Sequence, residues 1–265
     1  MTDPTSTRLA VPRLPRWRFF PVWRRNALVW RKLALPSLLG NVADPLLQLA
    51  AFGWGVGSLV GSVGGVPYIL FLASGTVSMS VMTAASFEAL FSAFSRMHVQ
   101  KTWDAILLTA TGLDDVLLGE LLWAASKSLL SGAAMIAIVA LLDISRAPTL
   151  LLALPLLALV GMLFAALGLI VTALARSYDF FTYYFTLVLT PMTFLSGVFF
   201  PLSAMPPWLR EIAAWLPLSV AVDLVRPLFF GRWDTAAPLH LALLLAEIYA
   251  AWRVARALAH RRFAG

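Results

Sequence analysis

Long apolar stretches alternate with short polar breaks along most of this chain. Each stretch is long enough for a helix to cross the roughly 30 Å hydrocarbon core of a bilayer, which takes about 20 residues. Six such stretches cover approximately residues 38–60, 68–92, 118–141, 149–174, 182–200 and 236–257. The pattern predicts an all-α integral membrane protein with six transmembrane helices.

One polar break differs from the short turns. Residues 61–67, 143–148 and 175–181 read as tight turns, whereas residues 93–117 are longer and predict a short amphipathic helix. Two alternatives stay open, because periodicity does not choose between them: the helix docks into a partner's groove, or it rests on the membrane surface. The residues that would make its apolar face and polar rim are Met97, His98, Lys101, Trp103, Asp104, Ile106 and Leu107.

The two segments that flank the spans also predict unusual helices. In residues 16–35, tryptophan and alanine recur at helical spacing while arginine and lysine gather on the opposite arc, which favours a helix lying in the headgroup plane. The alternative is a basic juxtamembrane segment that only sets topology. In residues 201–235, proline breaks at Pro201 and at 206–207 precede a short amphipathic segment.

Composition and charge agree with this interpretation. The 265 residues are 60% hydrophobic and 12% charged, about half the charged fraction of a soluble domain. The net charge of +7 sits beside the apolar spans, which favours anionic lipid headgroups over nucleic acid as the partner. Cysteine is absent, so no disulfide, thiolate metal site or cysteine nucleophile is available.

The distribution of lysine and arginine predicts the orientation. Fifteen fall on the side of the two termini and of residues 93–117, and four on the other side, so both termini are expected in the cytoplasm. The fifteen are Arg8, Arg13, Arg16, Arg18, Arg24, Arg25, Arg31, Lys32, Arg96, Lys101, Arg176, Arg253, Arg256, Arg261 and Arg262. The four are Arg146, Arg210, Arg226 and Arg232.

No catalytic, metal-binding or phosphate-binding motif is present in the sequence. The chain has no H-E-x-x-H, no G-x-S-x-G and no G-x-x-x-x-G-K-[ST], so we expect no catalytic residue, no metal site and no ATP site of its own. Polar residues inside spans are candidates for a translocation path, although pairing at a span end is the alternative for Asp44, Glu88 and Glu120. The candidates are Asp44, Gln48, Glu88, Glu120, Lys127 and Glu247. Glycines repeat at 53, 57, 61 and 65, and the first three predict one smooth helical face for close packing, either inside the subunit or between subunits.

Taken together, these features resemble an ABC-2 type transporter permease. The stretches LPSLLGNVADPLLQL, MTAASFEALFSAFSRMHVQKTWDAILLT, VTALARSYDFF and LTPMTFLSGVFFP are similar to the subfamily of nodulation-factor export permeases, the NodJ-like permeases. The resemblance implies a coupling helix between spans two and three, and short re-entrant helices at about 201–231, after span five. It places Phe199, Phe200, Trp208, Ile212 and Trp215 at the lipid or the exit path.

The resemblance also implies partners and a location. The partners are two copies of a separate NodI-like ATP-binding subunit, which would bind ATP and magnesium, a second copy of this permease, and membrane lipids. The expected layout is a cytoplasmic segment with the interfacial helix at 1–35, a transmembrane domain at 36–258 and a cytoplasmic tail at 259–265, in a bacterial inner membrane. The implied activity is export of an amphiphile such as a lipo-chitooligosaccharide. The alternatives are an intramembrane enzyme that modifies lipids or glycans, an ABC-2 permease for drugs or other lipids, and a passive channel.

Overall fold

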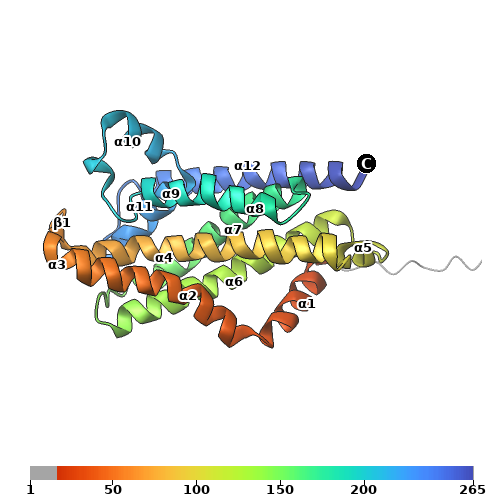
Figure 1. Cartoon of the computed structure of the whole chain (residues 1–265), viewed down its shortest axis with the longest axis horizontal. Helices are drawn as coiled ribbons and strands as arrows, with labels where there is room; N and C mark the ends of the chain where they lie inside the picture. The colour runs from red at the N-terminus through yellow and green to blue at the C-terminus, as the bar shows by residue number, and fades with distance from the viewer. Residues whose placement is uncertain (1–16, 265) are drawn as a thin grey trace, which may run out of the picture.

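The computed structural model describes residues 17–264, and these form an elongated bundle of helices with one two-residue hairpin (Figure 1). Three of the basic residues used to predict the orientation, Arg8, Arg13 and Arg16, lie outside the described residues, as does Gly265. The first half of the chain comprises α1 Phe19–Arg31, α2 Ala34–Ala50, η1 Ala51–Val56, α3 Gly57–Val60, β1 Ser62–Val63, β2 Val66–Pro67, α4 Tyr68–Phe87, η2 Glu88–Ser92, η3 Ser95–Val99 and α5 Thr102–Leu107. The second half comprises α6 Leu113–Leu141, α7 Leu150–Leu174, α8 Asp179–Tyr184, η4 Phe185–Leu189, α9 Thr190–Leu195, η5 Leu202–Ala204, α10 Pro207–Ala214, α11 Pro217–Phe229 and α12 Ala237–Ala264.

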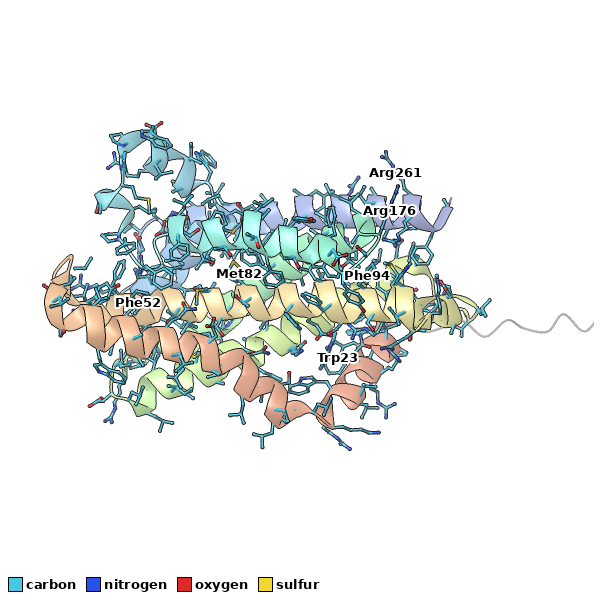
Figure 2. All side chains as sticks on the ribbon, viewed as in Figure 1. Trp23, Phe52, Met82, Phe94, Arg176 and Arg261 are labelled. Atoms are coloured by element: carbon cyan, nitrogen blue, oxygen red, sulfur yellow. The ribbon has the colours of Figure 1, made fainter. Side chains whose placement is uncertain are left out.

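Helix α4 is the centre of the bundle, with α2, α6, α7 and α11 packed around it. Figure 1 shows α5 and the C-terminus at one end, and the β1–β2 hairpin with α3 and α10 toward the other. We call these the α5 end and the α10 end. Arg176 and Arg261 both lie toward the α5 end in Figure 2, as the charge count predicts for one side of a membrane.

Three helices of the described chain are long and apolar enough to cross a membrane. They are Tyr68–Val99, which continues α4 through π-helical η2 and η3, then α6 and α7. Helices α10 and α11 meet at 83°, a geometry that fits either a fourth, broken span or the pair of re-entrant helices expected at about 201–231. The predicted spans at 38–60, 182–200 and 236–257 coincide with helical segments, but six crossings remain a prediction.

Small residues let these helices approach closely, as is common in membrane bundles. A Cβ added at Gly75 would lie 2.8 Å from the Val198 Cα, and one at Gly168 would lie 2.7 Å from the Ala89 Cβ. The predicted glycine repeat acts in the same way for its first member, because a Cβ at Gly53 would meet the Ile69 side chain at 2.9 Å. Gly61, by contrast, has φ +71 and ends α3 just before the hairpin, so the predicted smooth helical face does not extend to it.

Helix α1 forms where an interfacial helix was predicted, but its tryptophans face the bundle. Trp23 and Trp30 both pack edge-on against Trp123 of α6, with ring centroids 6.5 and 5.7 Å apart. The side chain of Trp23 also donates a hydrogen bond to the Ser126 hydroxyl. The large apolar residues that α1 leaves exposed are instead Phe20, Leu28 and Val29, so these would meet lipid.

Candidate functional site

A buried cluster of four charges joins α4 to α6 near the α5 end. The Glu88 carboxylate accepts from Lys127 Nζ at 2.8 Å and from the Arg96 guanidinium at 3.0 Å. The same guanidinium donates from Nε to Glu120 Oε1 at 2.9 Å, so Arg96 lies between two carboxylates. All four side chains are no more than 12% exposed. The cluster is neutral overall, which lowers the cost of burying its charges.

Uncharged donors complete the hydrogen bonding of both carboxylates. Glu120 accepts from Trp103 Nε1 at 3.1 Å and from Asn26 Nδ2 at 3.1 Å, and Glu88 accepts from Trp123 Nε1 at 2.8 Å. The network therefore ties α1, α4, α5 and α6 together, which makes the α5 end one connected polar unit.

This arrangement changes what the segment 93–117 can present to a partner. The helix of α4 continues to Val99, so the separate helix is only α5. We predicted that Trp103 would be an exposed residue available to contact a partner, and this is wrong for the described structure. Trp103 is 1% exposed and stacks near Phe263. Met97 is buried as well. Trp103 faces inward because Glu120 offers its N–H a charged acceptor, which a helical wheel does not reveal.

The exposed part of this segment lies on both sides of α5. Val99 is 60% exposed and Leu108 is 90% exposed, and neither was among the predicted docking residues. Lys101 and Asp104 are exposed and 3.9 Å apart, as expected for a polar rim. His98, also exposed, stacks on Phe94. Ile106 and Leu107 are half-buried.

Three cavities run from the charge cluster toward the α10 end. The first, of about 250 Å³, lies between α1 and the end of α4. The second, about 390 Å³, shares Ser37 and Lys127 with the first. The third, about 360 Å³, shares Asp44 and Thr83 with the second and extends to Phe199. Because neighbouring cavities share lining residues, they form one groove along α2, α4 and the η4–α9 segment, which we call the α2–α4 groove.

The groove combines hydrogen-bonding groups with aromatic rings. Gln48 Nε2 donates to Asp44 Oδ2 at 2.9 Å, while the Gln48 carbonyl oxygen is buried with no partner among the described residues. Hydroxyl groups line the groove at Ser37, Thr83, Thr190 and Thr193. The aromatic rings belong to Phe52, Phe87, Phe185, Phe194 and Phe199. Figure 2 shows Phe52 and Met82, two residues lining the third cavity, at different points along the bundle. Such a surface can hold a molecule that is part polar and part apolar.

Four of the six predicted path residues line this groove, and two do not. Asp44, Gln48, Glu88 and Lys127 line it. Glu120 is 2% exposed and is held by Arg96, Trp103 and Asn26, outside the residues that line the cavities.

Glu247 lies on α12, away from the groove. One of its oxygens is buried without a hydrogen-bond partner among the described residues. Sequence reasoning missed Arg96 as the centre of the cluster, because its position after an apolar span resembled an ordinary cytoplasmic cation.

The residues of the predicted exit region lie between α9 and α11, on and around the short helix α10. Trp208, Ile212 and Trp215 on and after α10 are 56% exposed or more, as an element facing lipid or solvent would be. Phe200 is also exposed, but Phe199 is buried and stacks with Phe194.

The sequence did not predict that α11 packs into the core. Its Arg226 donates to the Gly197 carbonyl at 2.6 Å and to the Ser74 hydroxyl at 2.9 Å, with its guanidinium 3.9 Å from the Phe71 ring centroid. The sequence predicted Arg226 to be one of the loop cations that set topology.

Comparison with known proteins adds a family match. Residues 19–230 match the ABC-2 type transporter family. Nodulation protein J of Rhizobium leguminosarum bv. viciae is 47% identical over 241 residues, which cover 91% of this chain and 93% of that protein. Nodulation protein J of Bradyrhizobium diazoefficiens is 50% identical over 223 residues, or 84% and 85% of the two chains. The inner membrane transport permease YadH of Escherichia coli is 24% identical over 91% of this chain and 93% of that protein.

Proposed function

The chain belongs to the ABC-2 type transporter family, and on that premise we propose that it exports an amphiphilic, lipo-oligosaccharide-like substrate with energy from a separate ATPase. The family and the relatives' names make it a transport permease subunit, not an enzyme. The α2–α4 groove is the observation that carries the substrate class. Its hydroxyl, amide and carboxylate groups suit a glycan, and its phenylalanines suit sugar faces and an acyl chain.

The proposed topology follows from the charges and the elements. We place the α5 end in the cytoplasm and the α10 end outside, in a bacterial inner membrane with six crossings and both termini inside. The groove then leads from the inner leaflet toward the outer one. A second copy of the chain would complete the path, because the groove lies on a face of the monomer that is open along α2 and α9.

The proposed energy source is a NodI-like ATPase with two copies per transporter. This chain has no phosphate-cradling G-x-x-x-x-G-K-[ST] motif, so ATP and magnesium would bind to the partner. We propose that the partner docks on the exposed tip around α5, with Leu108 and Val99 as apolar contacts and Lys101 and Asp104 at the rim. Trp103 would then transmit motion from α5 to α6, because its indole N–H on α5 donates a hydrogen bond to Glu120 of α6.

Export measured in cells tests the proposed groove. The chain and its ATPase would be co-expressed, and a labelled lipo-chitooligosaccharide followed from cells to medium. Asp44→Asn removes a charged acceptor, and Gln48→Leu removes the unpartnered carbonyl. We expect each to lower export several-fold or more, since one hydrogen bond contributes about 0.5–1.5 kcal/mol when neutral and about 1.5–3 kcal/mol when one partner is charged.

Asp143→Asn is the matched control, because Asp143 is 70% exposed in a turn and lies outside the groove. Its export should equal that of the unsubstituted chain. Normal export by both groove variants would remove the groove as the path. Export of a drug or another lipid in place of the lipo-chitooligosaccharide would keep the path and change the substrate.

A further inference from the structure

The first cavity of the groove has one positive charge, on Arg25, that has no ion-pair partner among the described residues. Its other two cations, Arg96 and Lys127, are paired with carboxylates, as shown above. Arg25 of α1 also lines the cavity, but its hydrogen bonds go to uncharged acceptors, Asn26 Oδ1 at 3.1 Å and Thr102 Oγ1 at 3.4 Å. Burial and the neighbouring Arg96 lower the pKa of Arg25, and Glu120 offsets this only in part, so an anion bound beside the guanidinium would stabilise its charge.

The same cavity also has a donor without an acceptor. Trp30 Nε1 is buried, and no described residue accepts its hydrogen bond. Leaving a buried N–H unsatisfied is costly, so a ligand acceptor would be stabilised there. Ser37 and Ser92 add hydroxyl groups to the lining, and Gln100 adds an amide. The interior therefore offers one free positive charge and several donors to a ligand.

The rim of the cavity is apolar and faces outward. Val29 and Leu33 line it and are 58% and 64% exposed. Both belong to the α1–α2 bend that would lie at the inner leaflet in the proposed topology. A ligand that fits an anion-accepting interior and an apolar rim has an acidic head and a hydrocarbon tail. A free inorganic anion would satisfy the interior alone.

From this geometry we infer that the cavity beneath α1 binds the phosphate headgroup of an anionic phospholipid, with Arg25 and Trp30 as donors and the acyl chain along Val29 and Leu33. This lipid is retained in the first cavity rather than exported, so the exported substrate would use the second and third cavities. The inference therefore goes beyond the proposed transport function. Its position between α1 and the Glu88 cluster would fix α1 against the bundle.

The test compares two lipids on the purified chain. The protein would be reconstituted in vesicles of phosphatidylglycerol and phosphatidylcholine in equal amounts, extracted in mild detergent, and examined by native mass spectrometry for retained lipid. We expect phosphatidylglycerol to be retained in preference. Arg25→Gln should lower that retention about tenfold, as expected for one lost charge-assisted hydrogen bond. Trp30→Phe should lower it by a smaller factor, because it removes only a neutral donor.

Arg24→Gln is the matched control, since Arg24 is the next residue on the same helix, carries the same charge and is exposed. It should retain phosphatidylglycerol as the unsubstituted chain does. Equal loss in Arg24→Gln and Arg25→Gln, or no preference between the lipids, would overturn the inference. So would full displacement of the lipid by millimolar inorganic phosphate. Trp30→Phe keeps every charge, so it tests the site even if Arg25→Gln does not fold. Asp44→Asn should leave retention unchanged, which separates this result from failure of the export proposal.

Discussion

Neutralising Glu88 should destabilise the protein strongly, and removing its partner Lys127 as well should restore much of the loss. Glu88 is 4% exposed and Lys127 is 11% exposed, so neither charge is well solvated. In Glu88→Gln, Arg96 keeps Glu120 as its counter-ion, but Lys127 loses the one carboxylate partner it has among residues 17–264. The cluster then carries a net positive charge inside the bundle.

The expected size follows from that unpaired charge. Removing one member of a buried pair typically costs about 3–5 kcal/mol. We expect Glu88→Gln to lower the free energy of unfolding by about 3 kcal/mol, because the new amide oxygen can still accept one hydrogen bond from Lys127. Lys127→Met leaves Glu88 paired with Arg96 and should cost less. The double variant Glu88→Gln/Lys127→Met is neutral again, so the two substitutions should be non-additive by about 1–3 kcal/mol.

Reversible unfolding in mixed micelles measures these differences. The ten tryptophans of the chain provide the fluorescence signal, and the four proteins of the cycle would be titrated with a denaturing detergent under one condition. Free energies of unfolding that add within about 0.5 kcal/mol would show that the two charges do not interact. That result would refute the buried cluster as described.

Two further predictions concern the α5 end. Leu108→Asp should reduce co-purification of the ATPase several-fold, because it places a charge where the structure exposes an apolar side chain. Thr109→Asp is the control, because Thr109 is the neighbouring exposed residue. Equal loss in both variants would argue against a contact at Leu108. Arg262→Ala should lower the free energy of unfolding by about 1–3 kcal/mol, because Arg262 donates to the carbonyls of Thr172, Ala173 and Ala175 at the end of α7. Arg261 is exposed, so Arg261→Ala should change the free energy of unfolding little. The same unfolding titration compares the two variants.

The apolar pattern predicted the long helices well, because hydropathy over twenty residues reports on a property of the whole segment. Stretches 68–92, 118–141 and 149–174 coincide with α4 and its extension, α6 and α7. The same signal did not mark α11, because this segment is shorter than a span. Short helices in this region were implied only by the family resemblance.

Side-chain direction at the α5 end was not predictable from periodicity. A helical wheel shows that Trp103 shares a face with apolar neighbours, but not whether protein, lipid or a partner covers that face. Its inward position depends on Glu120, seventeen residues later in the sequence, and on Phe263 of α12. The tryptophans of α1 were assigned to lipid for the same reason, whereas Trp123 of α6 covers them. Pairings between distant segments set these contacts, and a single sequence does not show them.

Photo-cross-linking of a labelled substrate tests most directly whether the α2–α4 groove is the path. The native chain has no cysteine, so a single cysteine can carry a photoactivatable group at Thr83, which is exposed in the groove and lines its second and third cavities. Leu245 on α12 is the control, because it is 47% exposed and lines none of the three cavities. With the ATPase and ATP present, we predict capture of labelled lipo-chitooligosaccharide at position 83 and little at position 245. Equal or greater capture at 245 would contradict it.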